Sequence, residues 1–178
     1  MKINVHAGHN PDGKVACGAC GIIKESTEAR KVAKEVIRIL REKGHTVYNC
    51  TVDNGTSQSD VLKKIVTKCN LHKVDLDVSI HFNAGASDKK GNGKATGTEV
   101  LIYSAKSKAK PYAEKVAKSI SELGFKNRGV KVRDNLYFLH RTNSPAMLIE
   151  CCFVDDKDDV KLYNYKKMAA AIVKGIIG

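Results

Sequence analysis

Apolar residues follow two patterns along this chain, one at helical spacing and one in short continuous runs. The helical spacing predicts helices from Ser26 or Thr27 to about Lys43, over residues 57–70 and 106–123, and one or two between 156 and the C-terminus. The short runs predict strands at residues 2–6, 46–50, 76–81, 97–103 and 146–153, with a short extended segment at 136–139. Strands that alternate with helices predict the α/β class. We expect a single-domain three-layer sandwich, in which helices flank a mixed, mostly parallel sheet.

The size and composition fit one folded domain. The 178 residues match the usual domain length, and the 42% hydrophobic content excludes a disordered chain. We therefore expect residues 1–178 to form one domain, without a linker. No apolar stretch approaches the roughly 20 residues of a membrane span, so we expect no membrane insertion. The N-terminal residues lack the apolar region of a signal peptide, so we expect no secretion by the chain alone.

The net charge narrows the class of partner. Lysine and arginine number 31 against 19 acidic residues, which gives +12 and favours an anionic partner. Nucleic acid, anionic lipid and an anionic cell-wall polymer all carry the required charge. The basic residues are spread over the whole chain, and aromatic residues make up only 6%. Because single-strand recognition needs aromatic side chains among basic ones, we expect no nucleic-acid partner.

Side chains that can bind metal follow the ends of the predicted core strands. His9 follows the first strand, His81 ends the third, and Glu150 lies in the last apolar run. Ligands of open α/β sheets gather outside the carboxyl ends of the strands. This pattern predicts a metal-dependent enzyme. His6 also lies near the end of the first strand, and only one of His6 and His9 need be functional.

A third metal ligand is expected near the start of the first helix. Glu25 and Glu28 both lie there, and either could serve. A carboxylate in the first turn of a helix also complements the helix dipole, which accounts for at least one of them without any metal. The residues alone leave the two glutamates as alternatives.

Glu150 is the strongest single indication of catalysis. It stands between Ala146-Met147-Leu148-Ile149 and Cys151-Cys152-Phe153-Val154. A carboxylate in so apolar a strand is costly unless it is paired or used. Burial would raise its pKa, which suits a general acid or base beside an activated water. The alternative is a structural ion pair with a lysine.

Other motifs exclude some reactions and leave other roles open. GxSxG, GxxxxGK[ST] and HExxH are absent, which excludes elbow-type serine hydrolases, P-loop enzymes and helix-borne zinc peptidases. Cys17 and Cys20 have CxxC spacing, but a second pair is missing, so a structural zinc site is disfavoured. Nothing in the sequence specifies a role for Cys151 or Cys152. His140, beside Arg141, is a possible substrate contact.

These motifs occur together in one known family. Gly8-His9, Glu25 at a helix start, Ser79-Ile80-His81-Phe82-Asn83-Ala84 and Leu148-Ile149-Glu150 stand in its order and spacing. The chain resembles, over nearly its whole length, the zinc-dependent N-acetylmuramoyl-L-alanine amidases of bacterial autolysins and phage endolysins. The resemblance implies Zn²⁺ on His9, Glu25 and His81. Glu25 is preferred to Glu28 because the apolar positions of the helix then fall in the family register.

The resemblance also implies the reaction. Glu150 becomes the catalytic glutamate, and Asn83 and His140 are expected to contact substrate. The family cleaves the amide between the lactyl group of N-acetylmuramic acid and L-alanine in peptidoglycan. Two departures stand out: His6-Ala7 replaces the usual Asp-Pro before Gly-His, and Cys151-Cys152-Phe153 replaces the usual segment that contains Gly-Phe. Neither departure removes a ligand or the catalytic glutamate.

We therefore expect a peptidoglycan amidase, either a phage endolysin that lyses Gram-positive cells or an autolysin fragment. As an endolysin it would be made in the host cytoplasm and would act on the wall after release. As an autolysin fragment it would be secreted. A cell-wall-binding module would lie outside this chain. The alternatives are a zinc peptidase acting within the stem peptide and a non-catalytic cell-wall-binding domain. The +12 charge suits anionic polymers of the wall.

Overall fold

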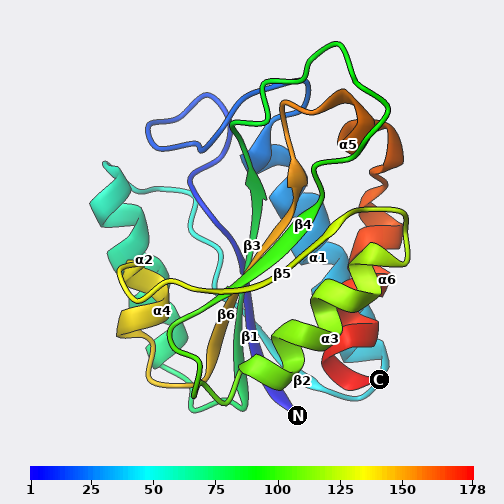
Figure 1. Ribbon diagram of the computed structural model, residues 1–178. Coiled ribbons are helices and arrows are strands. Elements are labelled where there is room, and N and C mark those ends of the chain that lie inside the picture. The colour runs from blue at the N-terminus through cyan, green and yellow to red at the C-terminus, as the bar shows by residue number, and fades with distance from the viewer.

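The computed structural model describes residues 1–178 and consists of a six-stranded sheet between two layers of helices (Figure 1). The strands are β1 (Lys2–Ala7), β2 (Thr46–Asn49), β3 (Leu76–Asn83), β4 (Thr98–Ile102), β5 (Asn127–Val132) and β6 (Ala146–Phe153). The helices are α1 (Glu25–Glu42), α2 (Gln58–Asn70), α3 (Lys110–Ser121), α4 (Tyr137–Arg141), α5 (Lys157–Leu162) and α6 (Tyr165–Ile177). This arrangement confirms the expected three-layer α/β sandwich. None of the helices is long and apolar enough to span a bilayer.

The strand order brings the expected site residues to one edge of the sheet. The order is β2-β1-β3-β6-β4-β5, and each pair of neighbours is parallel except β4 and β6, which are antiparallel. The sheet is therefore mixed and mostly parallel, as expected. Because β1, β3 and β6 are adjacent and parallel, their carboxyl ends lie together. In this register His81 on β3 pairs with Glu150 on β6.

Each face of the sheet is covered by its own group of helices (Figure 1). On one face, α1, α3 and α6 bury a large apolar core to which Val32, Val36 and Leu40 of α1 contribute fully buried side chains. Their spacing of four residues is the helical pattern visible in the sequence. On the other face, α2 and α4 form a smaller core, where Val61 packs with Phe138. The smaller core borders the site.

Two segments differ from the sequence-based expectation. The sequence predicts an extended segment at residues 136–139, but Tyr137–Arg141 forms the short helix α4, in which Phe138 and Leu139 are buried. The strand β5, Asn127–Val132, is not predicted. Its residues are half-buried or exposed, because it lies at the edge of the sheet, so it lacks a run of apolar residues. A smaller difference is that α1 begins at Glu25, one or two residues earlier than expected.

Candidate metal centre

Three side chains from distant parts of the chain converge at the carboxyl edge of the sheet. His9 lies just beyond β1, Glu25 opens α1, and His81 lies near the end of β3. Glu25 Oε1 lies 3.0 Å from His81 Nδ1 and 3.3 Å from His9 Nε2. The two imidazole rings meet edge to face, with their centroids 4.9 Å apart. Ligand atoms of all three residues lie within 4.8 Å of one another, which is close enough to share one metal ion.

The two histidines keep Glu25 in its charged form. Its side chain is buried, and it accepts hydrogen bonds from the backbone N–H groups of Ala19 (2.7 Å) and Phe82 (3.2 Å). Burial alone would raise the pKa of this carboxyl. Hydrogen bonds from His81 and His9 outweigh burial and hold the pKa of Glu25 well below its usual range. Burial lowers the pKa of His81, which keeps its ring neutral and available as a ligand.

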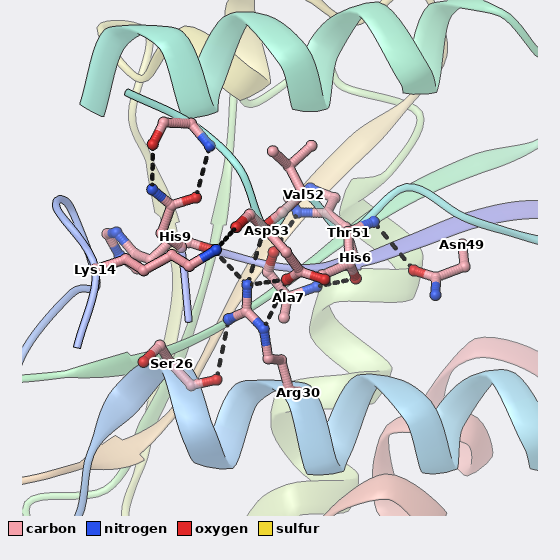
Figure 2. A network of polar contacts seen from close by, with 12 residues as sticks. His6, Ala7, His9, Lys14, Ser26, Arg30, Asn49, Thr51, Val52 and Asp53 are labelled. Atoms are coloured by element: carbon pink, nitrogen blue, oxygen red, sulfur yellow. Dashed lines mark hydrogen bonds and ion pairs between the residues drawn. The ribbon is translucent and has the colours of Figure 1, made fainter. Parts of the chain in front are cut away.

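A polar network fixes the loop that carries His9. Figure 2 shows Arg30 rising from α1 toward this loop and toward the segment that contains Val52 and Asp53. The Arg30 guanidinium donates to the backbone carbonyls of His9 (2.9 Å) and Val52 (3.0 Å) and pairs with Asp53 at 2.6 Å. His9 itself has φ of +65°, a left-handed conformation that is uncommon for residues other than glycine. Arg30 therefore stabilises an unfavourable turn that places the His9 ring in the cluster.

Two glycines make room for the cluster. A Cβ atom at Gly8 would overlap the His81 ring. A Cβ atom at Gly18 would lie 2.5 Å from Glu25 Oε2 and 2.8 Å from His9 Cδ2, and Gly18 also has φ of +80°. Both positions therefore require glycine, because any side chain there would displace a residue of the cluster.

Glu150 faces this cluster from the adjacent strand. Its Oε2 atom is buried and has no hydrogen-bond partner. Burial, with smaller contributions from the negative charges of Glu25 and Glu99, raises the pKa of Glu150 to about 8. A buried carboxylate oxygen without a partner is costly, so its position beside the cluster suits a group that exchanges a proton with a ligand.

The cluster opens into a cavity of about 370 Å³ between the sheet and the helices α2 and α4. His9, His81 and Glu150 line one part of its wall. The rest of the wall combines apolar side chains of α2, α4, β4 and β6 with polar residues that include Gln58, Arg133 and Asn135. A volume of this size suits a substrate group of a few residues. The cavity thus brings a bound molecule beside both the cluster and Glu150.

The other expected site residues lie outside the cluster. Glu28 pairs with Lys31 at 2.8 Å and accepts a hydrogen bond from the Tyr163 hydroxyl at 3.1 Å, so of the two glutamates only Glu25 faces the histidines. His6 is also outside the three-residue group, although it lines the cavity. The structure thus places His9 and Glu25 in the cluster, and His6 and Glu28 outside it, while the binding of metal by the cluster stays a prediction.

The two expected substrate contacts, Asn83 and His140, do not line the cavity. Asn83 donates to Glu99 at 3.2 Å, and Glu99 in turn pairs with Arg128 at 2.9 Å. His140 is exposed on α4 and stacks on Tyr103 with a centroid distance of 5.5 Å. Contact between either residue and substrate remains a prediction for a polymer that extends beyond the cavity.

Sequence reasoning missed several residues that shape the site. Arg30 has the pattern of an ordinary charged residue on an amphipathic helix, and no sequence signal marks its bonds to the His9 and Val52 carbonyls. Gly18 is one of several glycines in a loop. Ser79 stands in a recognisable motif, but its buried, unpartnered hydroxyl depends on tertiary packing.

Comparison with known proteins identifies the family of this chain. A family model described as N-acetylmuramoyl-L-alanine amidase matches residues 3–178. The chain belongs to the N-acetylmuramoyl-L-alanine amidase family. The solved structures of this family are amidases, and their catalytic domains share the architecture described above.

Individual relatives are similar over most of this chain. An uncharacterised 38.4 kDa protein of Clostridium perfringens is 41% identical over 180 residues, which cover 99% of this chain and 51% of that protein. The endolysin of Bacillus phage SPP1 is 32% identical over 177 residues, covering 95% of this chain and 60% of the endolysin. The chain thus spans about half to three-fifths of these relatives.

Solved structures share the fold over its full length. The catalytic domain of the CD27L endolysin targeting Clostridia difficile superposes with a TM-score of 0.87 at 28% identity, covering 99% of this chain and 97% of that domain. The amidase AmiC2 of Nostoc punctiforme superposes with a TM-score of 0.79 at 24% identity, covering 99% and 95%. The second likeness shows the fold alone.

Proposed function

We propose that this chain is the catalytic part of a zinc-dependent N-acetylmuramoyl-L-alanine amidase, and that it acts as a phage endolysin on Gram-positive cell walls. One observation carries the proposal. His9, Glu25 and His81 converge beside Glu150, a half-buried residue that has one buried, unpartnered oxygen and lines the cavity beside the cluster. Membership in the amidase family and the two endolysins among its relatives support the choice of substrate and setting.

The three side chains fit zinc. Catalytic zinc is held by three protein ligands, drawn from imidazole nitrogen, carboxylate oxygen and thiolate, with one position left for water or substrate. Two imidazoles and one carboxylate form such a set here, and the low pKa of Glu25 keeps its carboxylate charged. His9, Glu25 and His81 would hold the ion. When bound, zinc supplies a lowered water pKa and a polarised carbonyl oxygen.

The remaining chemistry belongs to Glu150. In amide hydrolysis the attacking water must lose a proton, and the leaving nitrogen must gain one before the C–N bond breaks. Glu150 can do both, because its carboxylate accepts the proton and its raised pKa lets it hold that proton until the amine needs it. Its buried, unpartnered Oε2 is the atom that would carry the proton. The proposed bond is the amide between the lactyl group of N-acetylmuramic acid and L-alanine.

The proposed setting is lysis from within an infected cell. The protein would be made in the host cytoplasm and would reach the wall after release. Its partner is then peptidoglycan, and the net charge of +12 favours additional contact with anionic polymers of the wall. A secreted autolysin is the second possible setting for the same catalytic site.

The proposal is tested with matched glutamate variants and product analysis on purified cell walls. The parent protein should release peptides with new N-terminal alanine and no new reducing sugar. Glu150→Gln should bind zinc normally and lose at least a hundredfold in turnover, the size of a general acid–base contribution. Glu25→Gln should lose zinc, whereas Glu28→Gln should keep both zinc and activity.

Each alternative gives a different result. New amino groups from residues other than L-alanine would identify a peptidase acting within the stem. Wall binding without any product would identify a non-catalytic binding domain. Full lysis after complete removal of bound metal would refute the metal assignment itself.

A further inference from the structure

Two polar atoms in the cavity wall are left unused by the proposed chemistry. His6 Nε2 and Ser79 Oγ are buried and have no hydrogen-bond partner. Their residues are 1% and 0% exposed, and both line the cavity that His9 and His81 of the cluster also line. His6 on β1 pairs directly with Ser79 on β3, so the two side chains lie next to each other on the same face of the sheet.

The hydrogen bond made by His6 Nδ1 defines what the second ring nitrogen, Nε2, can bind. His6 Nδ1 lies 3.1 Å from the backbone carbonyl oxygen of Ala7, and a carbonyl can only accept. The proton is therefore on Nδ1, which leaves Nε2 as an acceptor directed away from this bond. Burial lowers the pKa of His6 to about 3, so the ring stays neutral at physiological pH. Ser79 has a hydroxyl that can donate. Together the pair offers an acceptor beside a donor.

The surroundings of this pair restrict the class of ligand. Half of the residues that line the cavity are apolar, among them Val61, Leu62, Ile65, Leu101, Phe138 and Leu148. A sugar ring that packed against these apolar side chains would leave several of its hydroxyls without partners, which is costly. A peptide residue brings only one N–H and one C=O, and in an extended chain both point to the same side, as they do in paired strands. His6 and Ser79 stand on neighbouring strands, which lie about 4.8 Å apart. One extended residue can therefore direct its N–H to one of these side chains and its C=O to the other.

We propose that His6 and Ser79 form a subsite for the peptide backbone, which binds the stem-peptide residue that follows L-alanine. His6 Nε2 accepts the hydrogen bond from the N–H of that residue, and the Ser79 hydroxyl donates to its C=O. This assignment rests on the proposed amidase function, because it places the leaving peptide in the cavity. It gives a use to two buried groups whose isolation is otherwise unfavourable.

The subsite is tested in two ways. The N–H group of the substrate is replaced by an ester oxygen, and the acceptor or the donor is removed from the protein. The first probe is N-acetylmuramoyl-L-alanyl-glycine amide. The second replaces glycine by glycolic acid, so that an ester oxygen stands where the N–H was. The wild-type protein should cleave the first probe about fivefold to tenfold faster in kcat/KM, which corresponds to one hydrogen bond between neutral groups. Cleavage is measured at the muramoyl–alanine bond by the mass of the released fragments.

His6→Phe keeps an aromatic ring against Phe138, which packs edge to face on His6 at 4.7 Å, but removes the acceptor. In this variant the preference for the first probe should fall to about one. His72→Phe is the matched control, because His72 stacks on Tyr48 outside the cavity, and it should keep the full preference.

Ser79→Ala gives an independent measurement. It removes a buried hydroxyl without a partner, so the melting temperature should stay the same or rise. The kcat/KM for both probes should fall by a similar factor, since both retain the C=O. If His6→Phe keeps the wild-type preference, or if Ser79→Ala cleaves both probes at the wild-type rate, the subsite is wrong although the amidase assignment stands. If the wild-type protein cleaves a different bond in both probes, the proposed amidase function is wrong, and the subsite that rests on it is wrong as well.

Discussion

Two positions without a side chain matter for this site as much as the ligands themselves. Gly8 lies against the His81 ring, and Gly18 lies against both Glu25 and His9. The Ala19 N–H, next to Gly18, donates to Glu25 at 2.7 Å. The backbone of the Cys17–Cys20 segment therefore packs against the cluster and supports it. The CxxC spacing of its cysteines, which attracts attention in the sequence, is incidental to this role, since Cys20 is exposed and both thiols are free.

Gly18→Ala should weaken zinc binding by at least tenfold, because the new methyl group would push Glu25 or His9 out of position. Gly13→Ala is the matched control. Gly13 has the same φ of +80°, but a methyl group there would meet no heavy atom within 4 Å, so this variant carries the conformational strain alone. Competition with a chromogenic chelator measures zinc affinity for both variants. Equal affinities would show that strain, and not contact with the cluster, controls the site.

At the same scale, the sequence predicts the residues of the cluster better than the residues that support it. His9 and His81 could be found because each follows a strand, and strand ends meet at one edge of a parallel sheet. The choice between Glu25 and Glu28 could be made only by resemblance, since both occupy the first turn of α1. The structure separates them through the hydroxyl of Tyr163, which lies 135 positions along the chain from Glu28 and binds it.

At the scale of elements, Arg30 connects the helix α1 with the loop after β1 and the loop after β2. From α1 it reaches the His9 carbonyl after β1, the Val52 carbonyl after β2, and Asp53 (Figure 2). These contacts couple the start of α1, which carries Glu25, to the loop that carries His9. The relative position of His9 and Glu25 in the cluster therefore depends on one guanidinium group.

Arg30→Met should reduce zinc affinity about tenfold, in the range found when a supporting residue of a metal site is removed. The reason is that the left-handed turn at His9 would lose the donor that stabilises it. Arg41→Met is the control, because Arg41 lies on the same helix and also bonds a backbone carbonyl, that of Val47, far from the cluster. Both variants should lose some thermal stability. A similar loss of zinc affinity in Arg41→Met would mean that general destabilisation explains the effect.

The elements that sequence reasoning placed wrongly are those without a clear period. Four residues, 136–139, are too few to distinguish a helical turn from an extended segment, and burial of Phe138 and Leu139 on the sheet decides for the helix α4. The strand β5 contains Asn127, Arg128 and Lys131, and it pairs only with β4. An edge strand needs one partner and little burial, so its hydrogen bonds form without an apolar pattern.

At the scale of the whole molecule, the net charge of +12 predicts how the protein meets its substrate. Charges on the surface act over about 10 Å at 0.1 M salt and less at higher ionic strength. We expect adsorption to walls that carry anionic polymers to weaken severalfold between roughly 0.05 and 0.3 M salt at constant pH. Turnover of a soluble, uncharged muramoyl peptide should change little over the same range, because the cavity is lined mainly by apolar and neutral groups.

Walls stripped of anionic polymers provide the control and should bind with little dependence on salt. Equal salt dependence on intact and stripped walls would mean that the positive charge serves solubility and not attachment.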